Sequence, residues 1–103
     1  MYKIALVCQN GASTGIMVKK MLAAAQQEGI EVSIKAYSFG QLEDFISDVD
    51  YVLFGPQLAF KKDQTQKEFP QYVDKINTIA AVDFGMMRGE KVLKETIAAI
   101  QKR

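Results

Sequence analysis

The fold is decided near the start of the chain by the segment Ile4-Ala5-Leu6-Val7-Cys8-Gln9-Asn10-Gly11-Ala12-Ser13-Thr14-Gly15. Residues 4–7 form a short continuous apolar run, which predicts a strand buried on both faces. Residues 8–14 are small and polar, which predicts a loop. From residue 15 to 28, apolar side chains recur at spacings of three and four, which predicts an amphipathic helix; they are Met17, Val18, Met21, Leu22 and Ala25.

The alternation of strand and helix continues along the whole chain. Further strands are predicted at 32–36, 51–54 and 76–80, helices at 39–47, 57–69 and 90–102, and a loop at 83–89. In the third helix, Leu58, Ala59 and Phe60 are expected to face inward. This pattern predicts one α/β domain over residues 1–103, with a single four-stranded parallel sheet flanked by helices. The first and third strands are the most apolar, so we expect the flavodoxin-like order 2-1-3-4, with ligands beyond the carboxyl ends of these two strands.

Composition and charge exclude several classes of function. The 103 residues carry 13 Lys and Arg against 12 Asp and Glu, so the chain lacks the basic surface that nucleic-acid binding usually needs. There is no His and only one Cys, which excludes a histidine base, a histidine-rich metal site and an internal disulfide. We expect no metal and no other cofactor. No apolar run approaches the roughly 20 residues that cross a bilayer, and no secretory signal is visible, so a cytoplasmic location is expected.

The chemistry of the chain is concentrated at Cys8. A strand, a small polar loop and a helix start together create a nest of backbone N–H groups that favours an anion. Gly11 allows a tight turn, and Ser13 or Thr14 can cap the helix. This setting favours the Cys8 thiolate and can then hold the oxygens of a phosphoryl group on the sulfur. A lone cysteine is also often a small buried hydrophobe, and that interpretation remains open at this point.

Four segments make the sequence resemble a known family. They are the strand leading into Cys8 with Gly11 and Ser13-Thr14 after it, Leu53-Phe54-Gly55-Pro56-Gln57-Leu58-Ala59-Phe60, Asp83-Phe84-Gly85, and Val92-Leu93-Lys94. The chain is similar to the EIIB components of the lactose/cellobiose (chitobiose) type in the bacterial sugar phosphotransferase system (PTS). The resemblance covers essentially the whole chain.

The resemblance implies a phosphoryl relay. An EIIA partner would deliver phosphate from a phosphohistidine to Cys8, and phosphocysteine would pass it to a sugar, expected to be a β-linked disaccharide, bound by a membrane EIIC. Backbone N–H groups would cradle the phosphate over Gln9, Asn10, Gly11, Ala12, Ser13, Thr14 and Gly15. One departure is Gly15, where many relatives have serine. We expect a monomer that meets the inner face of the membrane transiently through EIIC. The exposed rim that contacts both partners is expected to include Met17, Gln57, Met86 and Met87.

Two other classes share parts of this pattern. Low-molecular-weight tyrosine phosphatases have the same strand, Cys loop and helix, but they need an arginine six positions after the cysteine, where this chain has Thr14, and an Asp-Pro general acid, which it lacks. A non-catalytic flavodoxin-like binding or redox-sensing module is the other alternative, with Cys8 forming mixed disulfides.

Overall fold

The computed structural model describes residues 1–8 and 11–102, with backbone only for residues 11–13. Its sheet has four parallel strands, β1 (Tyr2–Cys8), β2 (Val32–Ser38), β3 (Tyr51–Phe54) and β4 (Ile76–Thr78). They lie in the order β2-β1-β3-β4, so the predicted order is confirmed. The carboxyl ends of all four strands therefore share one edge of the sheet, and the two most apolar strands lie side by side in its middle.

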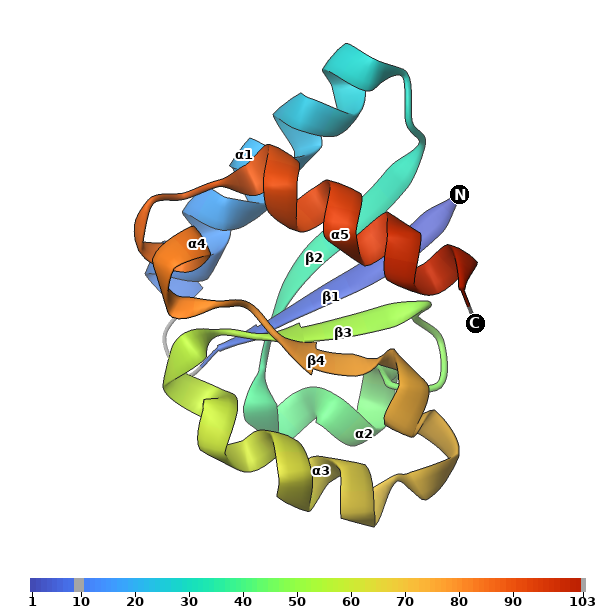
Figure 1. Cartoon of the computed structure of the whole chain (residues 1–103). Coiled ribbons are helices and arrows are strands. Elements are labelled where there is room, and N and C mark those ends of the chain that lie inside the picture. The colour runs from blue at the N-terminus through green and yellow to red at the C-terminus, as the bar shows by residue number, and fades with distance from the viewer. Residues whose placement is uncertain (9–10, 103) are drawn as a thin grey trace.

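Helices cover both faces of this sheet. One face carries α1 (Gly11–Glu28), α4 (Ala81–Gly85) and α5 (Gly89–Gln101), and the other carries α2 (Leu42–Phe45) and α3 (Lys62–Glu68), as Figure 1 shows. Three short 3₁₀ segments connect the layers: η1 (Phe39–Gln41), η2 (Pro56–Lys61) and η3 (Pro70–Lys75). The molecule is thus a three-layer α/β structure of the kind that the alternating pattern predicts.

The side-chain alternation of β1 divides the core into two halves. Ile4 and Leu6 point to the α1 and α5 face, where they pack with Met17, Met21 and Leu93. Ala5 and Val7 point to the opposite face and pack with a second group that consists of Leu42, Phe45, Ile46, Val52, Phe54, Leu58 and Ile76. Because both faces of β1 are covered, its apolar run is continuous rather than alternating.

The close packing of α1 against α5 depends on Gly89, the first residue of α5. A Cβ atom at this position would lie 2.6 Å from Cβ of Lys20 and 2.7 Å from its carbonyl carbon. These distances are far below van der Waals contact, and the carbonyl carbon belongs to backbone that cannot swing aside. Gly89 therefore sets how near the two helices approach each other.

Several boundaries differ from the sequence prediction. The third helix is not continuous, because η2 precedes α3, and within η2 only Leu58 is buried while Phe60 is 71% exposed. Ala59 is exposed as well, so the expected inward orientation is confirmed for Leu58 and is wrong for Ala59 and Phe60. The predicted loop 83–89 contains the end of α4 and a turn in which Met87 has a positive φ of 51°.

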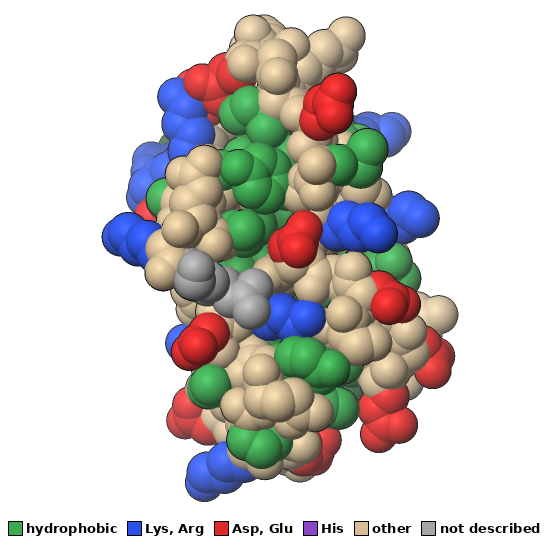
Figure 2. All heavy atoms as spheres, turned by 90° about the vertical axis from the view of Figure 1, so that its right-hand side faces the viewer, with side chains coloured by type: hydrophobic (Ala, Val, Ile, Leu, Met, Phe, Trp, Pro, Cys, Tyr) green, Lys and Arg blue, Asp and Glu red, His purple; other side chains and the backbone are tan. Residues whose placement is uncertain are grey.

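The amino edge of the sheet lies opposite the Cys8 edge. The two ends of the chain meet here, since the Gln101 amide donates a hydrogen bond of 3.1 Å to the Tyr2 hydroxyl. Figure 2 shows this side of the molecule, with Lys and Arg interspersed with Asp and Glu and small groups of hydrophobic side chains between them. This side presents no extended area of one charge.

Candidate functional site

Cys8 is the last residue of β1, in the middle of the sheet at its carboxyl edge. Its parallel partner is Ser38, the last residue of β2. The cysteine is 4% exposed and forms no disulfide. Gln9 and Asn10, which the sequence places in the phosphate cradle, lie outside the described residues. The thiol is thus held at the position where ligands of parallel sheets bind, with little of it open to solvent.

Helix α1 begins at Gly11, only three residues after Cys8. The first N–H groups of an α-helix have no acceptor within the helix, and among the residues of α1 they belong to Gly11, Ala12 and Ser13. The first turn contains no acidic residue, so the partial positive charge of this helix end is not compensated there. Gly15 is the fifth residue, and helix geometry pairs its N–H with the carbonyl of Gly11. The N–H of Thr14 also belongs to this ladder, because the residue before a helix accepts its first intrahelical bond, so the free donors of α1 end at Ser13.

Thr14 lies inside the helix rather than at its cap. Ser13 is also within α1, so the predicted capping role of these two residues is wrong, because the helix starts earlier than the polar composition suggests. Thr14 is 2% exposed, and its Oγ1 has no hydrogen-bond partner among the described residues. A buried hydroxyl without a partner is unusual in native proteins. It occupies the sequence position six residues after Cys8.

The turn between β3 and η2 forms the second wall of the site. The Gly55 N–H donates to the carbonyl of Val7 at 2.9 Å, which fixes this turn beside the end of β1. A Cβ on Gly55 would lie 2.8 Å from Oε1 of Gln57 and 3.8 Å from Sγ of Cys8. The prediction that Cys8 and the Gly55-Pro56-Gln57 segment are neighbours is therefore confirmed. The Gln57 amide and the thiol thus both border Gly55, although Gln57 as a whole is exposed.

The expected rim of partner-contacting residues is only partly exposed. Gln57 is exposed, Met86 is 64% exposed, and Met87 is half-buried. Met17 is fully buried in the core under α1, so its expected place on the rim is wrong. The helical repeat instead turns the preceding residue, Ile16, outward. Apolar side chains that are exposed on elements at the carboxyl edge, and that sequence reasoning missed, are Ile16, Phe60 and Val82.

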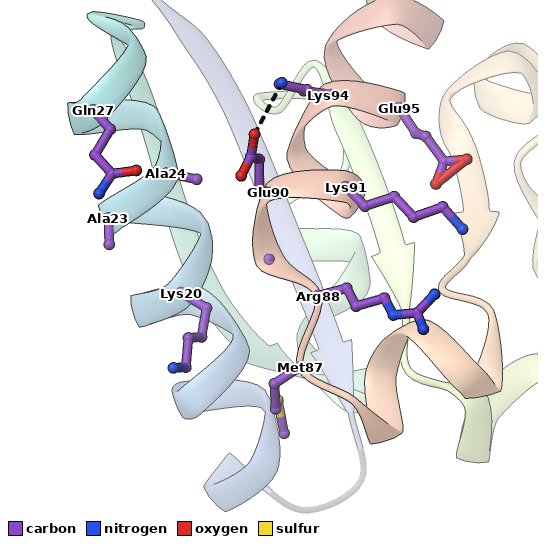
Figure 3. Close-up of a pocket in the computed structure, with 11 residues that line it drawn as sticks. Lys20, Ala23, Ala24, Gln27, Met87, Arg88, Glu90, Lys91, Lys94 and Glu95 are labelled. Carbon is purple, nitrogen blue, oxygen red and sulfur yellow. Dashed lines mark ion pairs between the residues drawn. The ribbon is translucent and has the colours of Figure 1, made fainter.

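A buried acidic residue holds the corner between α4 and α5. Asp83 is 3% exposed, and its carboxylate accepts hydrogen bonds from the Lys91 ammonium at 3.1 and 3.2 Å. Arg88 approaches the same carboxylate at 3.5 Å, and its backbone N–H donates to the Asp83 carbonyl. Figure 3 shows the side chains of Arg88 and Lys91 pointing away from α1. This cluster fixes the corner that carries the exposed Val82 and Met86.

A separate hollow on the described surface lies away from this site. It is a groove of about 650 Å³ between α1 and α5, lined from α1 by Lys20, Ala23, Ala24 and Gln27 and from the other side by residues 87–91, Lys94 and Glu95 (Figure 3). Lys94 forms ion pairs with Glu90 at 2.9 Å and Glu28 at 3.2 Å, and hydrogen bonding to Glu90 and then Glu28 raises its pKa above the usual value. None of the lining residues belongs to the first turn of α1 or to the β3–η2 turn.

The described residues show no grouping of three or more Cys, Asp or Glu side chains that could hold a metal ion. Within the same part of the chain, every helix is too short or too polar to span a bilayer.

Comparison with known proteins identifies the family. The family model for the lactose/cellobiose-specific IIB subunit of the PTS matches residues 3–95. The chain belongs to this family. It is therefore a PTS EIIB component, a subunit of a sugar phosphotransferase.

Individual relatives agree with this assignment. The chain is 36% identical to the oligo-β-mannoside-specific EIIB component of Bacillus subtilis, over 95% of both chains. It matches the solution structure of a cellobiose-specific IIB protein from Borrelia burgdorferi with a TM-score of 0.83 and 32% identity, covering 98% of this chain and 93% of that one. A lactose-specific EIICB component of Lacticaseibacillus casei is 27% identical over 73% of this EIIB chain, which corresponds to 13% of that longer protein.

The expected likeness to low-molecular-weight tyrosine phosphatases is confirmed at the level of the fold. The enzyme from Bacillus subtilis superposes with a TM-score of 0.63 at 15% identity, over 97% of both chains. At this identity the likeness concerns the arrangement of strands and helices only.

Proposed function

We propose that this EIIB component carries a phosphoryl group on Cys8, taking it from a phosphohistidine of an EIIA protein and giving it to a sugar bound by a membrane EIIC. The observation that carries the proposal is the position of Cys8, which ends a central strand three residues before the free N–H groups of α1. A phosphoryl group on Sγ would meet backbone donors and the positive end of an 18-residue helix.

The two transfers balance without help from a histidine of this chain. In the first step the Cys8 thiolate attacks phosphorus, an S–P bond forms, and the N–P bond of the donor breaks with its electron pair returning to the imidazole. In the second step a sugar hydroxyl oxygen attacks phosphorus, the S–P bond breaks, and the thiolate is restored while the hydroxyl proton leaves to a base of the sugar-binding partner. Each step needs in-line positioning and stabilisation of charge on three equatorial oxygens.

The residues of the first turn of α1 would supply that stabilisation. The N–H groups of Gly11 to Ser13 are free of intrahelical acceptors, and the Thr14 hydroxyl, which has no partner among the described residues, adds a side-chain donor. Gln9 and Asn10 complete the proposed cradle in the sequence, whereas helix geometry already pairs the Gly15 N–H with the Gly11 carbonyl. Cys8 is 4% exposed, so only a partner docked on the carboxyl edge could reach it.

The docking face would therefore be the exposed apolar side chains around this edge. The face consists of Ile16 of α1, Phe60 of η2, Val82 of α4, and Met86, which directly follows α4. We place Gln57 and Met87 on the same face. Adaptable methionine and aromatic side chains suit a surface that must accept two partners in turn. Residues 1–103 would act as one EIIB domain, monomeric and cytoplasmic, that reaches the inner face of the membrane through EIIC.

The relatives named for oligo-β-mannosides and cellobiose support a β-linked disaccharide as the final acceptor. The longer lactose relative carries an EIIC and an EIIB name in one protein, which supports EIIC as a partner. Phosphate monoester hydrolysis is the other outcome that the fold alone would allow. The uncharged, buried Thr14 at the position of the phosphatase arginine argues against it.

The test uses the purified protein with phosphorylated EIIA. Intact mass should increase by one phosphoryl group, located on Cys8 by peptide mapping, and the modification should disappear in Cys8→Ser or after alkylation of the only thiol. p-Nitrophenyl phosphate should not be hydrolysed. If EIIA stays phosphorylated beside wild-type protein, or if phosphate is found elsewhere than on Cys8, the proposal is wrong.

A further inference from the structure

The side chain of Gln57 lies in an unexpected place. Its Oε1 and the Sγ of Cys8 both lie within 4 Å of the point where Gly55 would carry a Cβ. Gln57 is otherwise exposed, and no hydrogen bond joins its amide to another described residue. A long polar side chain on the surface normally extends into water, where it keeps its rotamer freedom. Here it folds back over its own turn, against the side of Gly55 that Cys8 also approaches.

The turn is built so that this arrangement is possible. The Leu58 N–H donates to the Gly55 carbonyl at 2.9 Å, which closes a tight turn around Pro56. The Gly55 N–H is itself fixed to β1 through the Val7 carbonyl. Any side chain at position 55 would collide with the Gln57 amide at 2.8 Å but would only touch the sulfur at 3.8 Å. Glycine at this position therefore leaves space for the amide, and not for the thiol.

We propose that Gln57 is a catalytic residue of the relay, whose side-chain amide donates a hydrogen bond to a phosphoryl oxygen on Cys8. The inference rests on the proposed function and deepens it. The α1 donors would hold the group from the helix side, together with the Thr14 hydroxyl, which has no partner in the described part of the chain. Gln57 would hold the group from the β3–η2 turn. A rotation of half a turn about the terminal torsion presents either the amide oxygen or the NH₂ group.

A neutral amide suits a carrier better than a charged or acidic group. It stabilises the dianion in the carried state and during transfer without offering a proton to the leaving sulfur. No bond of the amide is made or broken in either transfer, because the S–P bond forms or breaks beside it. A hydrogen bond to a charged group is among the stronger ones in proteins, so its loss should be measurable.

The first test replaces the amide by groups of similar size. With phosphorylated EIIA in excess, the equilibrium fraction of phosphorylated Cys8 and the transfer kcat should fall on the order of tenfold in Gln57→Leu. They should fall further in Gln57→Glu, which places a negative charge beside the phosphate. The KM for phosphorylated EIIA should change less than the kcat in Gln57→Leu, because the proposed hydrogen bond to the phosphoryl group forms in addition to the docking contact. The ³¹P resonance of phosphocysteine should shift in Gln57→Leu.

The matched control is Gln71, an exposed glutamine of η3 that precedes β4 and so lies toward the amino edge. Gln71→Leu and Gln71→Glu make the same chemical changes and should leave all four quantities at the wild-type values. If the Gln57 variants match their Gln71 counterparts, the inference about Gln57 is overturned.

A second variant displaces the amide from the site while Gln57 itself stays unchanged. Gly55→Ala introduces a methyl group that must displace the Gln57 amide, which is the end of a flexible side chain. It should reproduce the loss seen in Gln57→Leu, and the double variant should lose no more than either single one. Additive losses would contradict the inference. Failure of the whole proposal is distinguishable, because wild-type Cys8 would then remain unphosphorylated.

Discussion

Lys91 donates to both carboxylate oxygens of Asp83, at 3.1 and 3.2 Å, across the corner between α4 and α5. The carboxylate is buried, whereas the lysine side chain is about half exposed. The ammonium can therefore be solvated without its partner, but the carboxylate cannot. This asymmetry decides what each substitution should do.

Loss of the Asp83 charge should loosen the corner at moderate cost. In Asp83→Asn the free energy of unfolding should fall by about 1–2 kcal/mol. The charge-assisted hydrogen bonds to the carboxylate are lost, but the new side-chain amide can still accept weaker hydrogen bonds. Lys91→Met should cost more, because a buried carboxylate loses its nearest cation. Urea unfolding measures both. Glu95→Gln, an exposed change on the same helix, should leave stability unchanged.

Ile16 and Met17 are adjacent in sequence but should respond oppositely to truncation. Met17→Ala opens a cavity in the core and should lower the free energy of unfolding by about 2–5 kcal/mol. Ile16→Ala, on the proposed docking face, should leave stability within about 0.5 kcal/mol of wild type. It should instead raise the KM for phosphorylated EIIA severalfold. Equal effects of the two changes on stability would contradict the assignment of the faces of α1.

Thr14→Val should separate stability from phosphate binding. The substitution removes a buried hydroxyl that has no partner among the described residues, so thermal unfolding should show equal or greater stability. The equilibrium fraction of phosphorylated Cys8 should nevertheless fall. Thr65→Val is the control, since its buried hydroxyl donates to the Lys61 carbonyl at 2.8 Å and lies outside the site. A Thr14→Val variant that is less stable yet fully phosphorylated would refute this role.

Gly89→Ala tests the close approach of α1 and α5. The added methyl meets Lys20 backbone, so the helices must separate and the free energy of unfolding should fall by about 1–3 kcal/mol. Gly85→Ala, where the added methyl meets nothing within 4 Å, should be close to neutral. Chemical denaturation compares the two, and similar values would contradict the contact.

Much of this architecture could be predicted because the apolar runs are short and unambiguous. Residues 4–7 and 51–54 had to be central strands, and the order β2-β1-β3-β4 followed. Helix starts were harder to predict. Ser13 and Thr14 are good capping residues by composition, yet α1 begins at Gly11, because residue type at a cap is a preference that does not fix the residue at which a helix starts.

The exposed face of the site was the least predictable part. Periodicity identifies an apolar stripe but does not distinguish a buried methionine from an exposed neighbour at the edge of the stripe, as Met17 and Ile16 show. Phe60 was expected inside on apolar character alone, yet the 3₁₀ geometry of η2 changes the spacing and turns it outward. The position of the Gln57 amide depends on a turn conformation that its own sequence letters do not reveal.

The hydrogen bond between Tyr2 and Gln101 brings both ends of the chain together at the pole farthest from the thiol (Figure 1). Any tether attached at either end would emerge there, behind the working surface. A tethered subunit could therefore rotate to present its cysteine first to a donor and then to a membrane-bound acceptor. The tether would not obstruct the approach of either partner.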